Sequence, residues 1–415
     1  PSPAASAAAS TSCCKAPSRP ADRRNAASSR PRPVAGFHHA LTMTTTLQLR
    51  SLITADGQLE LALHELPLPV PADDEVLIRV EATPINPSDI GLLFGAADLA
   101  TVEVGGTADR PRVRARVPAA AMAAMAGRVG QALPVGNEGA GTVVAAGASP
   151  AAQALMGRRV AVMGGALYAQ HRVAKADACL LLPEGTSAEQ GASCFINPLT
   201  ALGFVQTMRH EGHTAIVHTA AASNLGQMLN RIALADGFGL VSIVRSPAQV
   251  ALLKGQGAQH VVDRSAPDYT QRLAVAVAAT GATLGFDATG GGTLAAEILA
   301  AMEAALLRKA GAPYSRYGSD VHKQVYLYGS LDTGPTEIRR SFGFAWGIGG
   351  WLVFPYLSKL GPQVLASLKQ RVAAELTTTF ASHYSHRVSL AEALGAAAIA
   401  GYTKRATGDK YLITP

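Results

Sequence analysis

The feature that most constrains the fold is an alternation of short apolar runs with helical segments in the second half of the chain. The apolar runs are Ala215–His218, Leu240–Val244, His260–Asp263, Leu284–Asp287 and Gln324–Tyr328. Helices are expected between and after them, over residues 226–235, 247–254, 268–279 and 293–308. Strands of a parallel sheet are apolar throughout, because helices cover both faces of the sheet. The pattern therefore predicts a doubly wound α/β domain.

The first half of the chain follows a different pattern, with short strands separated by glycine and proline. Leu59–Leu63 and Glu75–Glu81 alternate between apolar and polar residues, whereas residues 142–146 and 159–163 are apolar runs next to glycines. Alternation of this kind is typical of strands with one buried face. We therefore expect an antiparallel β domain before residue 186.

Two further segments complete the expected elements. Residues 95–134 form a long insertion in which an arginine-rich run at 110–116 is expected to be a solvated loop and residues 118–126 a helix. At the other end, residues 364–376 predict an amphipathic helix and residues 410–413 a final strand with no neighbouring strand in its own region.

Charge and hydropathy exclude several classes of function. The chain has 415 residues, of which 48% are hydrophobic and 16% charged, so it has enough apolar residues for a large core. Residues 1–42 carry five of the seven net positive charges. The remainder is almost neutral and gives no electrostatic reason to expect nucleic acid or an anionic membrane as a partner. No apolar stretch is long enough to predict a membrane span.

Residues 1–42 are rich in alanine, serine, arginine and proline and poor in acids, a composition typical of an organelle transit peptide. This interpretation would place the protein in a chloroplast or mitochondrion. The alternative is a translated leader, because the sequence does not begin with methionine and Met43 opens the first patterned segment. In that case a cytoplasmic protein is expected.

The strongest chemical signal lies where the strand Ala215–His218 runs into the turn Thr219–Gln227. A turn of small residues at the start of a helix lets backbone N–H groups approach the pyrophosphate of a dinucleotide. Gly226 is the only glycine of this turn, and Asn224 stands where glycine is common. Asparagine tolerates the left-handed conformation better than most residues, so Asn224 suits this position, and the sequence leaves open whether it adopts that conformation.

The residues after the next strand indicate which dinucleotide is bound. Arg245 and Ser246 follow the strand Leu240–Val244. An acid at this point would bind the ribose 2′-hydroxyl of NADH, whereas an arginine suits the 2′-phosphate of NADPH. The sequence therefore predicts NADPH as the cofactor.

Four motifs occur in an order that resembles a known family. They are Asn-Pro-Ser-Asp at 86–89, Gly-Asn-Glu-Gly-Ala-Gly at 136–141, Asn-Pro-Leu-Thr-Ala at 197–201 and the turn at 220–227. Together they resemble the zinc-independent branch of the medium-chain dehydrogenase/reductase superfamily, which contains quinone oxidoreductases and enoyl-thioester reductases. The resemblance implies a GroES-like catalytic domain made from both ends of the chain, with a Rossmann domain inserted. It also implies a homodimer formed through the Rossmann sheet.

The resemblance implies the following division and site residues. The expected parts are the tail 1–42, the first catalytic part 43–185, the NADPH-binding domain 186–357 and the second catalytic part 358–415. Asn86 and Thr200 would border the nicotinamide and its ribose as the catalytic residues. The expected cofactor-binding residues are Asn197, Thr200, Ser223, Asn224, Leu225, Gly226, Gln227, Arg245, Ser246, Thr289, Gly290, Tyr328, Gly329 and Lys410.

Departures from the family pattern bear on the chemistry. No metal is expected, because residues 85–89 lack a cysteine ligand, Asn137 stands where the zinc-dependent branch has histidine, and a four-cysteine lobe is absent. Enoyl-thioester reductases carry a tyrosine shortly after the first motif, but residues 90–96 contain only Phe94 as an aromatic residue. Tyr168 is interpreted as structural and Cys194 as a buried small hydrophobe.

The sequence therefore favours an NADPH-dependent oxidoreductase that transfers hydride to a quinone or another activated double bond, such as an enone. One alternative is a 2-enoyl-thioester reductase of fatty-acid synthesis. The other is a non-catalytic NADPH-binding regulatory subunit, which the missing tyrosine and the glycine-poor turn keep open. The sequence leaves the acceptor undecided.

Overall fold

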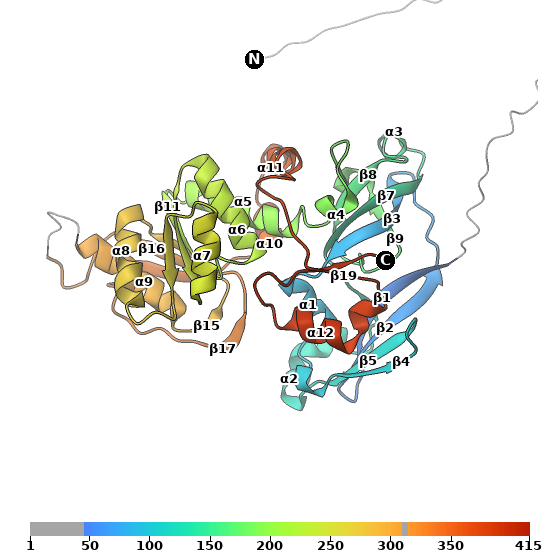
Figure 1. Ribbon diagram of the computed structural model, residues 1–415, viewed down its shortest axis with the longest axis horizontal. Helices are drawn as coiled ribbons and strands as arrows, with labels where there is room; N and C mark the ends of the chain where they lie inside the picture. Colours follow the sequence, from blue (N-terminus) through green and yellow to red (C-terminus); the bar gives the residue numbers. More distant parts are fainter. Residues whose placement is uncertain (1–44, 309–313) are drawn as a thin grey trace, which may run out of the picture. The chain divides into compact units, whose positions relative to one another are not determined.

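The computed structural model describes residues 45–308 and 314–415, which form three large sheets with helices around them (Figure 1). The first sheet has five antiparallel strands. Their order is β4 (Glu103–Gly106), β5 (Pro111–Arg116), β2 (Gln58–Pro67), β1 (Thr45–Ile53) and β6 (Leu133–Pro134). Its buried side packs against α1 (Pro87–Phe94), which begins at Asn86. This sheet therefore supports one of the predicted catalytic residues.

The second sheet contains strands from both ends of the described chain. Its order is β10 (Leu180–Leu181), β8 (Arg159–Met163), β7 (Glu138–Ala146), β3 (Glu75–Pro84), β20 (Tyr411–Ile413) and β19 (His386–Val388), with β9 (His171–Lys175) paired to β3. Strand β20 pairs antiparallel with β3, where Ile413 lies opposite Thr83. The last strand thus closes a sheet that the first half of the chain begins.

The third sheet is parallel and six-stranded. Its order is β13 (His260–Asp263), β12 (Gly239–Val244), β11 (Ala215–His218), β14 (Leu284–Asp287), β16 (Lys323–Leu327) and β18 (Trp346–Gly350). A small pair, β15 (Gly290–Gly292) and β17 (Asp332–Thr336), follows its carboxyl edge. The strand predictions for this region are confirmed to within a residue or two.

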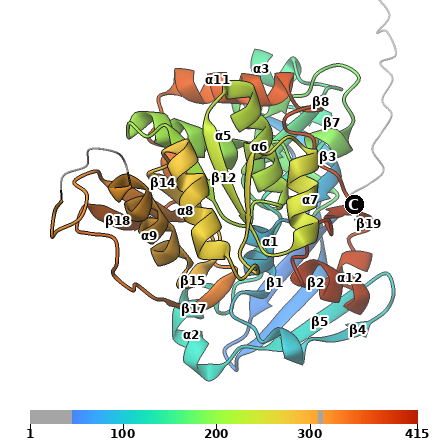
Figure 2. The same ribbon diagram turned by 60° about the vertical axis from the view of Figure 1, so that its left-hand side comes forward.

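Helices cover both faces of the parallel sheet, as Figure 2 shows. The helices of this region are α5 (Ile196–His210), α6 (Asn224–Asp236), α7 (Pro247–Gly255), α8 (Tyr269–Thr280) and α9 (Leu294–Leu307). Ile216 and Phe286 face α5 and α6, and Phe286 stacks on Phe204 with ring centroids 3.9 Å apart. Val217 and Ile243 face α8 and α9 on the other side. The fold is therefore the predicted combination of a GroES-like β domain and a doubly wound α/β domain.

The remaining helices lie around the first two sheets and against α5. They are α2 (Ala119–Met125), α3 (Pro150–Gln153), α4 (Ala188–Gly191), α10 (Val353–Leu357), α11 (Pro362–Ala374) and α12 (Ala396–Thr403). Short 3₁₀ turns lie at Leu99–Thr101, Ala126–Arg128, Ala176–Ala178 and Glu392–Leu394. Helix α4 begins with a capping box in which Ser187 and Gln190 bond each other's backbone N–H. Among the helices of the described ranges, none is long and apolar enough to cross a membrane.

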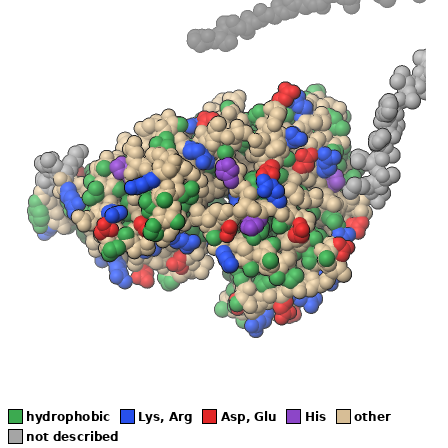
Figure 3. Space-filling model, in the orientation of Figure 1, with side chains coloured by type: hydrophobic (Ala, Val, Ile, Leu, Met, Phe, Trp, Pro, Cys, Tyr) green, Lys and Arg blue, Asp and Glu red, His purple; other side chains and the backbone are tan. Residues whose placement is uncertain are grey.

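Two expectations about local structure were wrong. The arginine-rich run is strand β5 rather than a loop, because Val113 and Ala115 alternate with the arginines and are buried against β2 and α1. The exposed arginines include Arg114, which pairs with Glu60 at 3.2 Å. The last strand does have a neighbour from its own region, since β19 pairs parallel with β20. On the face shown in Figure 3, cationic and anionic side chains are intermixed.

Candidate dinucleotide and catalytic site

The turn after β11 carries the predicted pyrophosphate-binding residues. Ser223 caps α6, and its hydroxyl accepts a hydrogen bond of 3.2 Å from the Gly226 N–H. Asn224 is the first helical residue and is not left-handed. Ala220 takes the left-handed conformation instead, with φ of 49°. The tight bend therefore comes two residues after the strand and before the cap, which leaves the helix free to start at Asn224.

Gly226 brings α6 close to the end of β11. A Cβ atom built on Gly226 would lie 2.2 Å from the carbonyl oxygen of Ala221 and 2.6 Å from its carbonyl carbon. Ala221 and Ala222 are themselves buried. The close approach of backbone to helix therefore requires glycine at 226, which is the packing role of the last glycine in a dinucleotide-binding turn. Leu225 is buried, and Gln227 donates from Nε2 to the Ala222 carbonyl oxygen at 3.0 Å.

The residues after β12 lie where the adenosine end of a dinucleotide is expected. Ser246 caps α7, and the Arg245 side chain is exposed without an ion-pair partner among the described residues. Gln249 accepts from the Arg245 backbone N–H at 2.9 Å and donates to the Thr407 hydroxyl at 2.7 Å. This second bond ties the Rossmann helix α7 to the loop after α12, which reaches toward α7 in Figure 1.

A buried carboxylate joins the loops at the carboxyl ends of β11 and β14. Asp287 accepts from the Thr219 hydroxyl at 2.7 Å and from the backbone N–H groups of Thr289 and Gly290 at 2.8 and 3.2 Å. Gly329 lies against this loop, because a Cβ there would come within 2.6 Å of the Ala288 carbonyl oxygen. The predicted residues Thr289, Gly290 and Gly329 are thus gathered at one edge of the sheet.

Tyr328 lies at the same edge, but its hydroxyl is already bonded. It lies 2.8 Å from Nε2 of His218, a fully buried residue at the end of β11. Burial lowers the pKa of His218 to about 3, so the imidazole is neutral. The Tyr328 ring stacks on His218, with centroids 5.7 Å apart. Tyr328 can therefore offer a ring face or backbone groups to a ligand, whereas its hydroxyl is bonded to the buried His218.

The predicted catalytic residues meet around a second buried carboxylate, that of Glu138. Nδ2 of Asn86 donates to Oε1 of Glu138 at 2.8 Å, and the N–H groups of Phe195 and Ile196 donate to Oε2 at 2.9 Å each. Asn197 Nδ2 lies 3.5 Å from Asn86 Oδ1. Thr200 is one turn along α5 and donates to the Ile196 carbonyl oxygen. The structure thus brings Asn86, Asn197 and Thr200 together from two distant parts of the sequence.

Asp89 holds the backbone beneath this cluster. Its carboxylate accepts from the Asn86 N–H at 2.8 Å and from the Asn137 N–H at 2.9 Å. Burial raises the pKa of Asp89 to about 7 despite these bonds. Glu138 and Asp89 were absent from the predicted site, although both lie within the motifs that carried the family resemblance. Their capacity to organise the site depends on which donors surround them, and sequence spacing does not reveal that.

Lys410 brings a cation to the same cluster. Its Nζ atom is buried and has no hydrogen-bond partner among the described residues, and it lies 5.4 Å from the centroid of the Tyr384 ring. Burial lowers the pKa of Lys410 to about 8, while Glu138 and Asp89 act in the opposite direction. An ammonium group without a partner is costly in a buried position, so the site is suited to an anion.

The structure places no hydroxyl where enoyl-thioester reductases have their tyrosine. Phe94 is buried, and its ring packs near that of Tyr402 with centroids 6.3 Å apart. Tyr168 is fully buried, and its hydroxyl donates to the Pro84 carbonyl oxygen at 3.0 Å, as expected of a structural residue. Cys194 is also buried, and burial raises the pKa of its thiol.

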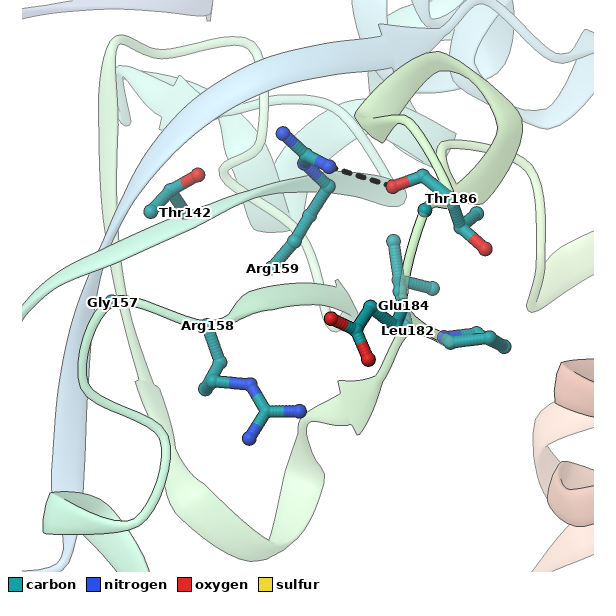
Figure 4. A pocket seen from close by; sticks show the side chains of 9 residues that line it. Thr142, Gly157, Arg158, Arg159, Leu182, Glu184 and Thr186 are labelled. Atoms are coloured by element: carbon teal, nitrogen blue, oxygen red, sulfur yellow. Dashed lines mark hydrogen bonds between the residues drawn. The ribbon is translucent and has the colours of Figure 1, made fainter.

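Neither a metal cluster nor the surface pocket beside β8 adds to this site. Within the described ranges, no three His, Cys, Asp or Glu side chains come together in a way that could hold a metal ion. A pocket of about 340 Å³ lies between β7, β8 and the turn at 182–186, lined by Arg158, Arg159 and Glu184 among others (Figure 4). None of the predicted site residues lines it.

Comparison with known proteins places this geometry in context. No family model matches the chain. Over 200 residues, which are 46% of this chain, it is 29% identical to a mitochondrial enoyl-[acyl-carrier-protein] reductase of Xenopus tropicalis. The chain spans about half the length of that curated relative, since the match covers 49% of it.

The solved structures match over nearly the whole described chain. A putative NADPH:quinone reductase of Mesorhizobium loti is 26% identical, with a TM-score of 0.67, and the match covers 90% of this chain and all of the other. Etr1p, solved with NADP and crotonyl-CoA, is 18% identical with a TM-score of 0.63 over 90% of this chain and all of the other, and supports the fold alone. The fold is therefore that of the solved NADPH:quinone reductases and enoyl thioester reductases, in agreement with the resemblance that the four sequence motifs indicate.

Proposed function

We propose that the protein is an NADPH-dependent, zinc-independent oxidoreductase that transfers hydride to a quinone or another activated double bond. The observation that carries this proposal is the turn at 219–227, where Gly226 allows the N-terminus of α6 to approach a phosphate. The positive end of that helix and its free N–H groups favour an anion. The similar structure from Mesorhizobium loti is that of a putative NADPH:quinone reductase, which agrees with the proposed reaction class.

Two features of the site fit a dinucleotide. The small residues Ala221, Ala222 and Gly226 leave room for a phosphate beside the backbone of the turn. The buried ammonium of Lys410, whose Nζ has no hydrogen-bond partner among the described residues, would attract another anionic or polar group of the cofactor. The exposed Arg245 and the Ser246 hydroxyl would hold the 2′-phosphate that distinguishes NADPH from NADH. The proposed cofactor-binding residues are Asn197, Thr200, Ser223, Asn224, Leu225, Gly226, Gln227, Arg245, Ser246, Thr289, Gly290, Tyr328, Gly329 and Lys410.

The bound dinucleotide would supply the hydride, and the protein would supply orientation and exclusion of water. Asn86 and Thr200 would border the nicotinamide ring, because the Glu138 cluster holds Asn86 within hydrogen-bond range of Asn197 on α5. Both asparagines are buried, so their amides can direct a polar ligand without competition from bulk water. We propose no protein proton donor for quinone reduction, since water protonates a hydroquinone anion.

A second candidate function is reduction of a 2-enoyl thioester. The name of the curated relative favours it, whereas the buried Phe94 in place of a tyrosine disfavours it. A thioester enolate needs a proton at carbon after hydride transfer, and residues 90–96, which follow the first motif, carry no side-chain hydroxyl for this purpose. A non-catalytic NADPH-binding subunit remains the alternative if the cofactor binds without turnover.

We further propose that the protein is a homodimer and is imported into an organelle. Strand β18 ends the six-stranded sheet, and its sequence Trp-Gly-Ile-Gly-Gly carries no charge that would block pairing with a second copy. The composition of residues 1–42, which lie outside the described ranges, supports a transit peptide. The curated relative is named as mitochondrial, and this favours the mitochondrion.

Turnover of NADPH by the purified full chain tests the proposal. The assay follows cofactor absorbance with an ortho-quinone, an enone and a short enoyl thioester in parallel, and NADH serves as the control. We expect NADPH oxidation with the quinone or the enone at a higher kcat/KM than with NADH. Faster turnover of the thioester would support the second candidate, and binding of NADPH without any turnover would support the non-catalytic alternative.

A further inference from the structure

We propose that Glu138 is the positioning residue of the catalytic site: its carboxylate fixes the orientation of the Asn86 amide and joins it to the N-terminus of α5. The inference rests on the proposed function, because Asn86 and Thr200 border a nicotinamide only if a dinucleotide binds there. It goes beyond that function by assigning a role to a residue that touches neither substrate nor cofactor.

The two oxygens of Glu138 serve different parts of the molecule. Oε1 accepts from the side chain of Asn86, at the start of α1. Oε2 accepts from the backbone N–H groups of Phe195 and Ile196, at the start of α5. Glu138 has no exposed surface, so water cannot replace any of these bonds. One side chain therefore connects the catalytic β domain to α5, the helix that leads into the Rossmann domain.

The bond to Oε1 decides which way the Asn86 amide faces. A carboxylate only accepts, so the NH₂ group of Asn86 must point toward Glu138 and the carbonyl oxygen away from it. The carbonyl oxygen then faces Nδ2 of Asn197, at 3.5 Å. The backbone of Asn86 is fixed separately by Asp89. The amide thus has one orientation rather than two.

The bonds to Oε2 place the other half of the site. They anchor the first turn of α5, the helix that carries Asn197 and Thr200. The positive end of this 15-residue helix also favours the negative charge of Glu138. Loss of the carboxylate would therefore change the distance between Asn86 and Thr200 as well as the orientation of Asn86.

The substitution Glu138→Gln tests this role at nearly constant volume. A carboxamide has a single oxygen. If its NH₂ group faces α5, it opposes two N–H donors. If its oxygen stays with α5, its NH₂ group faces the NH₂ of Asn86, and the Asn86 amide must turn over to accept from it, which reverses the orientation that the carboxylate imposes. We expect kcat to fall about 10- to 100-fold, because misplacement on this scale disturbs near-attack geometry. The KM for NADPH should change less than kcat. The isotope effect with NADPH deuterated at the transferred hydrogen should increase as hydride transfer becomes slower.

The control is Glu303→Gln, which alters an equally buried glutamate outside the site. Glu303 pairs with Lys323 at 2.7 Å, and both side chains are at most 3% exposed. This variant should lower the melting temperature without changing the isotope effect of the folded enzyme. If Glu138→Gln behaves in the same way, with the kcat and isotope effect of the unchanged protein, the inference is overturned.

A double substitution tests the bond without relying on activity. In Glu138→Gln combined with Asn86→Asp, the new carboxylate accepts from the new carboxamide, whose oxygen remains free for the N–H groups of α5. We expect the double variant to melt above Glu138→Gln alone, or to fold where the single variant does not. A melting temperature that Asn86→Asp fails to raise would overturn the inference. If this coupling is found but the unchanged protein oxidises no NADPH, the proposed function fails and the positioning contact stands.

Discussion

Gly226→Ala tests the structural basis of the dinucleotide turn. The added methyl group would lie 2.2 Å from the Ala221 carbonyl oxygen and 2.7 Å from its Cα. Both atoms belong to the backbone, so relief requires α6 to move away from the turn by about 1 Å, since an ordinary carbon–oxygen contact is above 3 Å. Overpacking of this kind costs about 1–3 kcal/mol, and the higher helix propensity of alanine offsets about 0.5–1 kcal/mol.

The expected net effect is a loss of about 1 kcal/mol in the free energy of unfolding, which corresponds to about 2 °C in melting temperature. The same shift of α6 would withdraw its N–H groups from the phosphate, so the Kd for NADPH should rise at least about 10-fold, or 1.4 kcal/mol. Differential scanning calorimetry and isothermal titration calorimetry measure the two quantities. The second measurement uses the folded variant well below its melting temperature.

Gly255→Ala is the matched control. It lies in α7, and a Cβ there meets no atom within 4 Å. Alanine should therefore leave NADPH binding unchanged and stabilise the helix slightly. If Gly226→Ala melts at or above the unchanged protein and binds NADPH equally well, the close approach of α6 does not build the turn and the reasoning is wrong.

Three further predictions concern charged groups of the site. Arg245→Ala should raise the Kd for NADPH about 10-fold and leave the Kd for NADH nearly unchanged. The control Arg112→Ala removes an exposed arginine on β5 and should change neither Kd. Equal losses of affinity for both cofactors would contradict a 2′-phosphate contact. Burial lowers the pKa of Lys410 to about 8, so the ammonium is lost as pH rises through 8 and NADPH binding should weaken there. Isothermal titration calorimetry from pH 6 to 9 measures this change. Lys410→Ala should bind NADPH weakly, with a Kd that does not vary with pH over this range. Asp287→Asn should weaken NADPH binding, because it replaces one of the two acceptors that hold Thr219, Thr289 and Gly290; an unchanged Kd would show that these loops do not need the carboxylate.

The pH dependence of folding has the opposite sign for Lys410. Its folded pKa of about 8 lies below the ordinary value of 10.5, so the unfolded chain binds more protons between these two values. The contribution of Lys410 to the free energy of unfolding therefore increases as pH rises from 8 toward 10.5. Its contribution to the affinity for the cofactor decreases over the same range. Lys410→Ala should abolish both trends.

The parallel sheet was predictable because its strands are apolar runs bounded by turns, as expected of strands buried on both faces. These runs are too short to be buried helices. Strand β5 was missed because charge dominates the segment 110–116. The alternation of Val113 and Ala115 with arginines was present in the sequence, but only pairing with β2 makes it a strand. The parallel pairing of β19 with β20 was missed for the same reason, since β19 has three residues and no pattern of its own.

The site was predictable in its motifs and less so in its geometry. The left-handed residue of the turn is Ala220 rather than Asn224, because the cap at Ser223 already places Asn224 inside the helix. Propensity alone favoured asparagine, and the requirement of the helix cap decided otherwise. The role of Glu138 depends on donors that lie 52 or more residues away in sequence, and no local spacing reveals them. Asp287 has local donors in Thr289 and Gly290, but its bond to Thr219 joins residues 68 positions apart.

The most direct test of the central claim is cofactor oxidation by the purified full chain in the presence of an ortho-quinone, with metal removed by a chelator. The account predicts many turnovers per protein, a clear preference for NADPH over NADH and no loss of rate on chelation. Rates that are equal for the two cofactors, or that depend on added zinc, would contradict it. Tight NADPH binding with no turnover of quinone, enone or enoyl thioester would contradict the catalytic claim and leave only the binding site.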